Sequence, residues 1–326
     1  MIIPEKLKRG DMVRVIAPAT SLAIISEANQ EIARARLAAL GLRLSFGQHV
    51  GEQNAFDSSS IHSRLADLHA AFADPAVRLV LAVIGGYNSN QLLRHIDWEL
   101  VRRNPKAISG FSDITVLGNA IFTKTGIVTY AGPAFANFAE EQYFDYTLDM
   151  FRRCLFDSRP FEVQPSTVWT DDKWYRDQTD RHPIPNPGYQ VIRAGEAEGM
   201  IIGGNLCSLN LLQGTEYMPP LADSLLFLEE SELSSLREFD RNLQSLLHLP
   251  DAGGIRGIVI GRFQHTSGAT PDLIRQLIEA KPELSNIPVV AAADLGHTQS
   301  MITFPIGGRA RLVVRGAEVQ LTITEH

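Results

Sequence analysis

The stretch Val77–Ile96, VRLVLAVIGGYNSNQLLRHI, contains the pattern on which the fold prediction depends. It begins with a run rich in Val, Leu and Ile, passes through Gly85-Gly86, and continues with apolar residues at helical spacing. A short apolar run followed by glycines and then a 3.6-residue period is typical of a strand, a sharp turn and a helix. Ser89 lies where the helix is expected to begin, and its role is the first question.

Three interpretations of Ser89 are open at this point. It is an N-cap, because serine oxygens accept hydrogen bonds from the free amides of a first turn. It belongs to a phosphate-binding loop, although IGGYNSNQ matches neither GxGxxG nor GxxxxGK[ST]. Or it is a nucleophile raised on a tight turn, although Tyr87 and Gln91 occupy the glycine positions of GxSxG.

The rest of the N-terminal half repeats the alternation of strand and helix. Strands of this kind separated by helices of ten to fifteen residues predict an α/β domain with a doubly wound, mostly parallel sheet over residues 1–159. The predicted strands are 12–20, 42–46, the start of the opening stretch, a short strand ending at Gly110, and 127–133; the predicted helices are 26–41, with Ser26 and Gly41 as caps, 61–75 and 114–126.

This alternation ends in a polar segment rich in proline and tryptophan. Residues 160–188 keep no period of 2 or 3.6, and we interpret them as an interdomain linker. From residue 189 to 326 a smaller, β-rich α/β domain is predicted, ending in a hairpin that turns at Arg315-Gly316-Ala317. Helical patterns at 208–213, 235–247 and 271–280 lie between its strands.

Bulk composition excludes several classes of protein. A length of 326 residues suits two domains, and 44% apolar with 21% charged residues is ordinary for a soluble globular chain. A net charge of −7 without a strong basic run argues against a nucleic-acid polymer as partner. No apolar stretch is long enough for a signal peptide or a spanning helix, so we expect a cytoplasmic protein without a membrane partner, and Cys154 and Cys207 as buried thiols.

A serine nucleophile requires a base, and the base requires an orienting carboxylate. His297 follows the apolar strand IPVVAAADLG, at a strand's carboxyl end where reactive groups of such sheets gather; His265, in GRFQHTSG, is the rival base. Glu229 and Glu230 end the apolar run SLLFLEES on opposite faces of a strand, so one of them is expected to point into the protein. An ion pair with Arg237 or Arg241 is the alternative to pairing with an imidazole.

With these residues in hand, the chain resembles the LD-carboxypeptidase family of serine peptidases over nearly its whole length, and within it the branch that contains the microcin C immunity carboxypeptidase. The motifs occur in the family's order: IAPAT, IGGYNSNQLL, GFSDIT, GGNLCSLNLLQGTEYMP, LFLEES with FDRNLQSLL, and DLGHTQSMITFPIGGRARL. The resemblance implies that Ser89 is the nucleophile, Glu229 the orienting acid and His297 the base. It thereby selects Glu229 over Glu230, which departs from the family's usual LFLED, and His297 over His265.

The resemblance also implies the surroundings of this triad. Backbone N–H groups of Asn90 and of Gly85 or Gly86 would hold the oxyanion. The N-terminal domain would be of the class I glutamine amidotransferase type, with the triad assembled across the interface between domains. Members are typically homodimers and use no metal or cofactor.

Substrate choice depends on two departures from the murein-directed pattern. Those relatives commonly read GGYGS, a residue and Arg, whereas this chain reads GGYNSNQ, which places Asn88 beside the serine. The segment STVWTDDKWYRDQ resembles a loop whose aromatic ring stacks on a nucleobase, and Trp174 is slightly preferred to Trp169; otherwise both rings simply cover the domain interface. We also expect Asn88, Ser112 and Asp113 to contact substrate.

Three functions follow in order of preference. The first is hydrolysis of the amide bond of aminoacyl or peptidyl nucleotides of the microcin C kind, for self-immunity or detoxification. The second is release of the terminal D-alanine from murein tetrapeptides in cell-wall recycling. The third is a catalytically silent binding protein, against which the complete triad argues.

Overall fold

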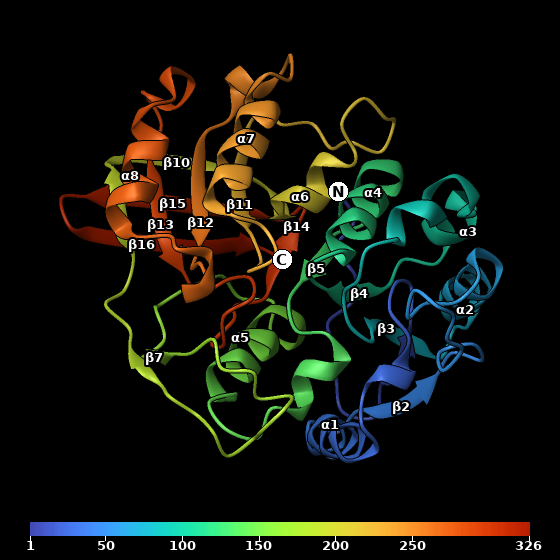
Figure 1. The fold of residues 1–326 in the computed structure, drawn as a ribbon. Helices are drawn as coiled ribbons and strands as arrows, with labels where there is room; N and C mark the ends of the chain where they lie inside the picture. The colour runs from blue at the N-terminus through green and yellow to red at the C-terminus, as the bar shows by residue number, and fades with distance from the viewer.

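Two β-sheets lie side by side in the molecule (Figure 1). The structure is a computed structural model and describes all 326 residues. The first sheet has the order β14-β5-β4-β3-β1-β2, and all its strands are parallel except β14, which runs antiparallel to β5. Its strands are β1 (Met12–Ile16), β2 (Arg43–Phe46), β3 (Val77–Ala82), β4 (Ala107–Gly110), β5 (Thr129–Ala131) and β14 (Phe304–Ile306).

The helices of this half connect its strands. Figure 1 shows α2 and α3 at the outer side of the sheet and α4 toward the second sheet. The helices are η1 (Leu22–Ile24), α1 (Glu27–Ala39), α2 (Ile61–Ala73), η2 (Ser89–His95), α3 (Trp98–Arg103), α4 (Ile114–Thr125), η3 (Phe135–Ala139) and α5 (Asp145–Phe156), where η marks a 3₁₀-helix.

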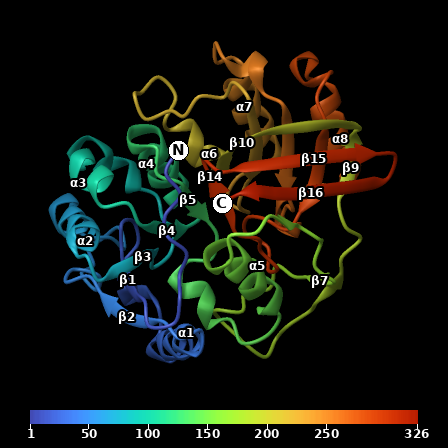
Figure 2. The same ribbon diagram turned by 180° about the vertical axis from the view of Figure 1, so that it is seen from behind.

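The second sheet is larger and mixed. Its order is β6-β16-β15-β10-β11-β12-β13-β9, with β10 to β13 parallel and the remaining pairs antiparallel. Figure 2, from behind, shows β15 and β16 running across it as a long pair. The strands are β6 (Phe161–Glu162), β9 (Gln190–Arg193), β10 (Gly195–Asn205), β11 (Ser224–Glu229), β12 (Gly257–Gly261), β13 (Val289–Ala293), β15 (Arg309–Arg315) and β16 (Glu318–Glu325).

Helices α7 and α8 lie on the face of this sheet turned to the viewer in Figure 1. The helical elements of this half are α6 (Leu206–Asn210), α7 (Leu236–Leu247), η4 (Ala252–Gly254), η5 (His265–Ser267), α8 (Pro271–Glu279) and η6 (Pro282–Leu284). Between the two halves, residues of the predicted linker form a small two-stranded sheet of β7 (Val168–Trp169) and β8 (Ile184–Pro185).

The mixed α/β architecture with parallel sheets is confirmed, and local signals explain several element ends. The Ser26 side chain accepts from the Asn29 amide and so begins α1. Gly41 adopts a φ of +83° just beyond α1, but Leu40 rather than Gly41 holds the C-cap position. The predicted terminal hairpin exists as β15 and β16, which pair Arg315 with Glu318.

Three details differ from the sequence-based expectations. The helix after Gly85-Gly86 is the 3₁₀-helix η2 and not an α-helix. Strand β14, from the C-terminal half of the chain, completes the first sheet, and a single core of buried apolar side chains includes residues of both sheets. Cys154 is buried as expected, but Cys207 is exposed because it lies in the first turn of α6 at the protein surface.

The carboxyl ends of the parallel strands of both sheets meet where the halves join. Asn119 on α4 donates to the Gly203 carbonyl of β10 at 2.9 Å, and Thr115 on the same helix accepts from the Asn205 amide at 2.9 Å. Loops that follow β3, β4, β11 and β13 therefore open toward one region, which is where α/β sheets carry their sites.

Candidate active site

The turn after β3 is built on close backbone approach. A Cβ on Gly85 would lie 2.8 Å from the Ser112 Cβ, and one on Gly86 would lie 2.6 Å from the Thr20 Oγ1. Neither distance is tolerated by a real side chain, so only glycine lets this turn pack against its neighbours. The N–H groups of both glycines make no hydrogen bond within the chain.

Ser89 is fully buried at the start of η2. Its N–H donates to the Asp113 Oδ2 at 2.9 Å, and its hydroxyl donates to the Asp113 carbonyl oxygen at 2.8 Å. Asn88 holds the N-cap position and neither it nor Ser89 caps the helix with its side chain, so the interpretation of Ser89 as an N-cap is wrong. Ser112, just before Asp113, adopts a φ of +61°, a conformation that L-residues seldom take.

A buried arginine that the sequence analysis missed lies beneath this turn. Arg64 of α2 donates through Nη1 to the Asn88 carbonyl and side-chain oxygens, both at 3.0 Å, and through Nη2 to the Gln91 Oε1 at 2.6 Å. A signal was available, because Arg64 shares a helix face with the buried Leu68, Ala71 and Phe72. A charge on the apolar stripe of an amphipathic helix requires a polar partner in the interior.

On the second sheet, Glu229 at the end of β11 pairs with His297 after β13. The Glu229 Oε2 and the His297 Nδ1 are 2.7 Å apart, and the carboxylate is almost fully buried. Two glycines make room for it: a Cβ on Gly296 would lie 2.5 Å from that Oε2, and one on Gly261 would lie 2.9 Å from the Glu229 Cβ. The other oxygen, Oε1, is buried without a hydrogen-bond partner.

The His297 imidazole is held from two directions. Its ring packs against Phe111 with centroids 5.1 Å apart. Burial by itself would lower its pKa, but the Glu229 carboxylate, helped by Glu230 and Glu232, raises the pKa above the usual 6.5. With Nδ1 engaged by Glu229, Nε2 is the nitrogen left to exchange a proton.

The rival base has a different environment. His265 is largely exposed, pairs with Asp171 at 3.0 Å, and stacks on Trp169 with centroids 4.8 Å apart. It therefore serves the linker segment and not the turn that carries Ser89.

Strand alternation predicted that one of the two glutamates would point into the protein, and both are buried. Glu230 accepts from the Asn205 side chain at 2.8 Å and from the Cys207 amide at 3.2 Å. Burial and the neighbouring Glu229 raise its pKa. Neither glutamate forms an ion pair with Arg237 or Arg241, so that alternative is wrong.

One loop contacts the groups from both sheets. In the motif GFSDIT, Phe111 touches His297, Asp113 holds Ser89, and Thr115 accepts from Asn205. Ser89 and His297 are not hydrogen-bonded to each other, because the serine hydroxyl is engaged by the Asp113 carbonyl. This loop thus links Ser89 of the first sheet with His297 of the second, and the serine hydroxyl donates to Asp113 instead of to the imidazole.

The two linker tryptophans differ in what covers their rings. Trp169 stacks on the His265 ring and contacts the Arg262 guanidinium, whose carbon is 4.8 Å from the Trp169 ring centroid. Trp174 is also buried. The ring of the largely exposed Tyr175 packs against it edge-on, with the two ring centroids 6.0 Å apart. Both rings are therefore buried, and Trp174 belongs to the apolar core shared by the two sheets.

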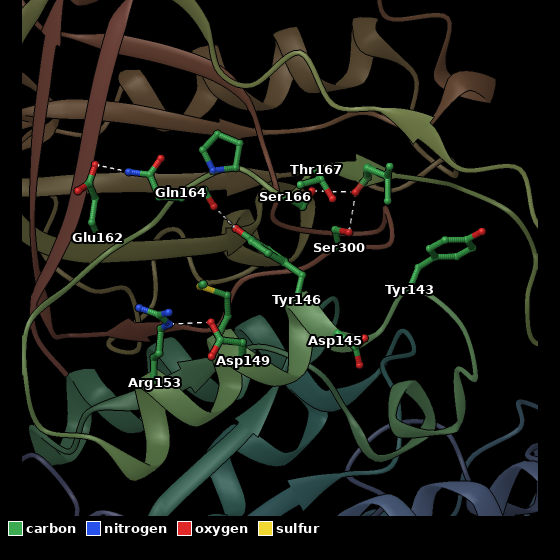
Figure 3. Close-up of a pocket in the computed structure, with 13 residues that line it drawn as sticks. Tyr143, Asp145, Tyr146, Asp149, Arg153, Glu162, Gln164, Ser166, Thr167 and Ser300 are labelled. Atoms are coloured by element: carbon green, nitrogen blue, oxygen red, sulfur yellow. Dashed lines mark hydrogen bonds and ion pairs between the residues drawn. The ribbon is translucent and has the colours of Figure 1, made fainter.

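A cavity of about 410 Å³ lies between α5 and the linker (Figure 3). Most of the residues that line it are polar; Tyr146 donates to the Gln164 carbonyl, and Arg153 pairs with Asp149. Ser89, Glu229 and His297 do not line it. No group of three or more His, Cys, Asp or Glu side chains is arranged to hold a metal ion.

Two family models match the two halves of the chain. Residues 13–132 match the model of the LD-carboxypeptidase N-terminal domain, and residues 198–312 match that of the C-terminal domain. The chain belongs to the LD-carboxypeptidase family. None of its helices combines the length and apolarity needed to cross a membrane.

Individual relatives match most or nearly all of the chain. The Bacillus subtilis protein named "Putative carboxypeptidase YocD" is 49% identical over 99% of both chains. The murein tetrapeptide carboxypeptidase of Pseudomonas aeruginosa is 30% identical over 77% of this chain and 76% of its own.

Two solved structures extend the comparison. An MccF-like protein from Bacillus anthracis is 50% identical and covers 100% of both chains with a TM-score of 0.99. The microcin C7 self-immunity protein MccF in complex with aspartyl sulfamoyl adenosine is 26% identical, covers 100% of this chain and 99% of its own, and has a TM-score of 0.89.

Proposed function

We propose that this LD-carboxypeptidase family member is a serine hydrolase that cleaves the amide bond of aminoacyl or peptidyl nucleotides of the microcin C type, with Ser89, Glu229 and His297 as its triad. The observation that carries the proposal is the 2.7 Å contact between Glu229 and His297 at the end of one sheet, together with the loop that touches His297 through Phe111 and holds Ser89 through Asp113. A buried carboxylate on Nδ1 fixes the tautomer whose Nε2 accepts a proton.

Attack begins with a change of hydrogen bond. The Ser89 hydroxyl leaves the Asp113 carbonyl and turns to the His297 Nε2, which removes its proton while Oγ attacks the amide carbonyl. His297 then gives that proton to the departing amine. Water, deprotonated by the same imidazole, attacks the acyl-enzyme, and the proton returns to Ser89 as the acid is released.

The oxyanion would be held by backbone donors of the glycine turn. The N–H groups of Gly85 and Gly86 have no partner within the chain, and that of Asn90 lies in the first turn of η2, where no helical acceptor exists. The Ser89 N–H is occupied by Asp113 and does not contribute. Each such donor typically lowers the barrier by about 3 to 4 kcal/mol.

The preference for a nucleotide substrate rests on the similarity of this chain to MccF and an MccF-like protein. An MccF-like protein shares half its residues with this chain over the full length, and MccF itself is known in complex with an aminoacyl sulfamoyl nucleotide. Of the two tryptophans we retain Trp174 for stacking on the base, since the Trp169 ring already stacks on His265 and contacts the Arg262 guanidinium. Replacement of Trp174 by Ala should lower kcat/KM for the nucleotide by roughly tenfold, from one stacking contact.

The runner-up is release of D-alanine from murein tetrapeptides, favoured by the likeness to a murein tetrapeptide carboxypeptidase. The deciding experiment assays the purified chain side by side with aspartyl sulfamoyl adenosine and a murein tetrapeptide, with product release followed by mass spectrometry. Cleavage of the nucleotide at the higher kcat/KM is expected. Preferential cleavage of the tetrapeptide would reverse the ranking, and absence of cleavage of both would leave a binding role.

A cytoplasmic homodimer remains the arrangement we expect for this enzyme. Size-exclusion chromatography with light scattering would test the dimer directly.

A further inference from the structure

The peptide bond between Asn88 and Ser89 is held at both ends by buried groups of opposite charge. Arg64 donates from Nη1 to the Asn88 carbonyl oxygen at 3.0 Å, and Asp113 accepts from the Ser89 N–H at 2.9 Å. These two atoms belong to one trans peptide group and point in opposite directions. The cation therefore meets the negative end of the peptide dipole and the anion its positive end.

Both charged groups are committed to the protein. Arg64 is 3% exposed and Asp113 is 2% exposed, so neither side chain is open to a substrate. Burial raises the pKa of Asp113, while the hydrogen bonds from Ser89 and the charge of Arg64 oppose that rise. We expected Asp113 to contact substrate. Its carboxylate instead accepts the hydrogen bond of the Ser89 backbone N–H.

The same guanidinium holds the side chains on either side of Ser89. Its Nη1 also reaches the Asn88 Oδ1 at 3.0 Å, and its Nη2 reaches the Gln91 Oε1 at 2.6 Å. A planar fork with several fixed donors can make these contacts together, whereas a lysine ammonium on a flexible stem cannot. Arg64 is therefore matched in shape as well as charge to the sequence Asn88-Ser89-Asn90-Gln91.

We infer that Arg64 and Asp113 are positioning residues that clamp the Asn88–Ser89 peptide, and that Arg64 fixes the direction of the Ser89 side chain for attack. This inference rests on the proposed function for its kinetic consequence. The clamp prevents the peptide from flipping, which would turn the Asn88 carbonyl toward the Asp113 carboxylate and the Ser89 N–H toward the Arg64 guanidinium. It also leaves the glycine amides as the donors for the oxyanion.

The main test replaces Arg64 by Lys and measures kcat, KM and the pH profile of kcat/KM with the better of the two substrates. A misplaced nucleophile should lower kcat by about 10²-fold. KM should stay within about threefold, because ground-state binding is untouched. The acidic limb of the pH profile should not move, since the Glu229–His297 pair is unaltered.

The matched control is Arg193→Lys, a half-buried arginine of β9 that donates to the Leu284 carbonyl far from the turn. It should leave kcat within about twofold of the wild type, as independent distant sites do. A kcat for Arg64→Lys equal to that of the control, or a loss confined to KM, would overturn the inference.

A double-mutant cycle tests whether the two residues act together. If Arg64→Gln and Asp113→Asn disturb the same peptide, the double variant should lose no more than about tenfold beyond the worse single variant. Losses that multiply would mean independent roles and refute the clamp. Should Arg64 variants not fold, Gln91→Ala removes only an exposed partner of Arg64 and should still lower kcat by several-fold; an unchanged kcat would count against the clamp.

Hydrogen exchange supplies a readout that needs no substrate. Arg64→Lys should speed exchange of the Ser89 amide by at least about tenfold, measured on peptides spanning 84–95 by mass spectrometry. If the wild type cleaves nothing, the proposed function fails alone, and the clamp stands or falls on this exchange rate. Unchanged protection of Ser89 would refute it.

Discussion

The two halves of the site secure their reactive groups by different means. Ser89 on the first sheet is held by its own domain through charged groups that act on the backbone, Arg64 on one side and Asp113 on the other. His297 on the second sheet is held through its side chain, by one carboxylate and one aromatic ring. A backbone clamp fixes position, whereas a carboxylate on an imidazole fixes both orientation and protonation. Substitutions that disturb the Ser89 backbone should therefore lower kcat, whereas substitutions around His297 should also change the pH dependence of kcat/KM.

The largest effect is expected from the nucleophile itself. Ser89→Ala removes the attacking oxygen and should lower kcat by roughly 10⁶-fold while the substrate still binds. Quenched-flow assays and calorimetric titration of aspartyl sulfamoyl adenosine measure these two quantities separately. Retained turnover in Ser89→Ala would show that Ser89 is not the nucleophile, and the two halves could then no longer be compared as holders of reactive groups.

The next largest loss in kcat is expected from replacement of Glu229, the carboxylate of the second half. Glu229→Gln keeps the shape but donates where it should accept, and the loss in kcat should be on the order of 10⁴-fold, as for other orienting carboxylates. The base works only when neutral, so wild-type kcat/KM should fall as the pH drops through a midpoint above 6.5, since the pKa of His297 is raised.

Loss of the Glu229 charge should move that midpoint. The carboxylate raises the pKa of His297 and burial lowers it, so removing the carboxylate leaves burial as the larger influence. The acidic limb of the residual activity should therefore shift to lower pH in Glu229→Gln. A limb that stays where it was would mean that another group titrates there.

A smaller effect should follow from crowding the same carboxylate. Gly296 has a φ of +101° and its added Cβ would lie 2.5 Å from the Glu229 Oε2, so Gly296→Ala should displace the carboxylate and cost about 10²-fold in kcat/KM. Gly268→Ala is the matched control, because Gly268 has a φ of +69° but open space around its Cβ position. Equal losses in the two variants would assign the effect to backbone strain alone.

The sequence allowed prediction of whatever depends on local pattern. The apolar run before Gly85-Gly86 predicted a strand and turn, and the carboxyl ends of strands predicted where Ser89, Glu229 and His297 would lie. It could not reveal how α2 packs against the nucleophile turn, because the partner of Arg64 is set by tertiary contacts 24 to 27 residues away in the chain. The likeness to class I glutamine amidotransferases stays a prediction of the resemblance.

The burial of Glu230 has a related cause. Alternation puts Glu229 and Glu230 on opposite faces but does not say what covers each face; α6 and the end of β10 surround Glu230 and supply Asn205 and Cys207 as donors. The side chains of Asn88 and Asp113 were expected to face substrate, and their engagement by Arg64 and Ser89 depends likewise on neighbours that no local period encodes.

The smallest effect tests what joins the two halves. Thr115→Val removes the oxygen that accepts from the buried Asn205 amide across the junction, and an unsatisfied buried N–H should lower the free energy of unfolding by about 1 to 3 kcal/mol. Thr123→Val is the control on the same helix, since the Thr123 hydroxyl only donates to the Asn119 carbonyl of its own helix and its loss should cost less. Urea unfolding followed by fluorescence measures both. If Thr115→Val also lowers kcat, the halves depend on this contact for alignment; if only stability changes, the junction is held by the shared core and each half keeps its own geometry.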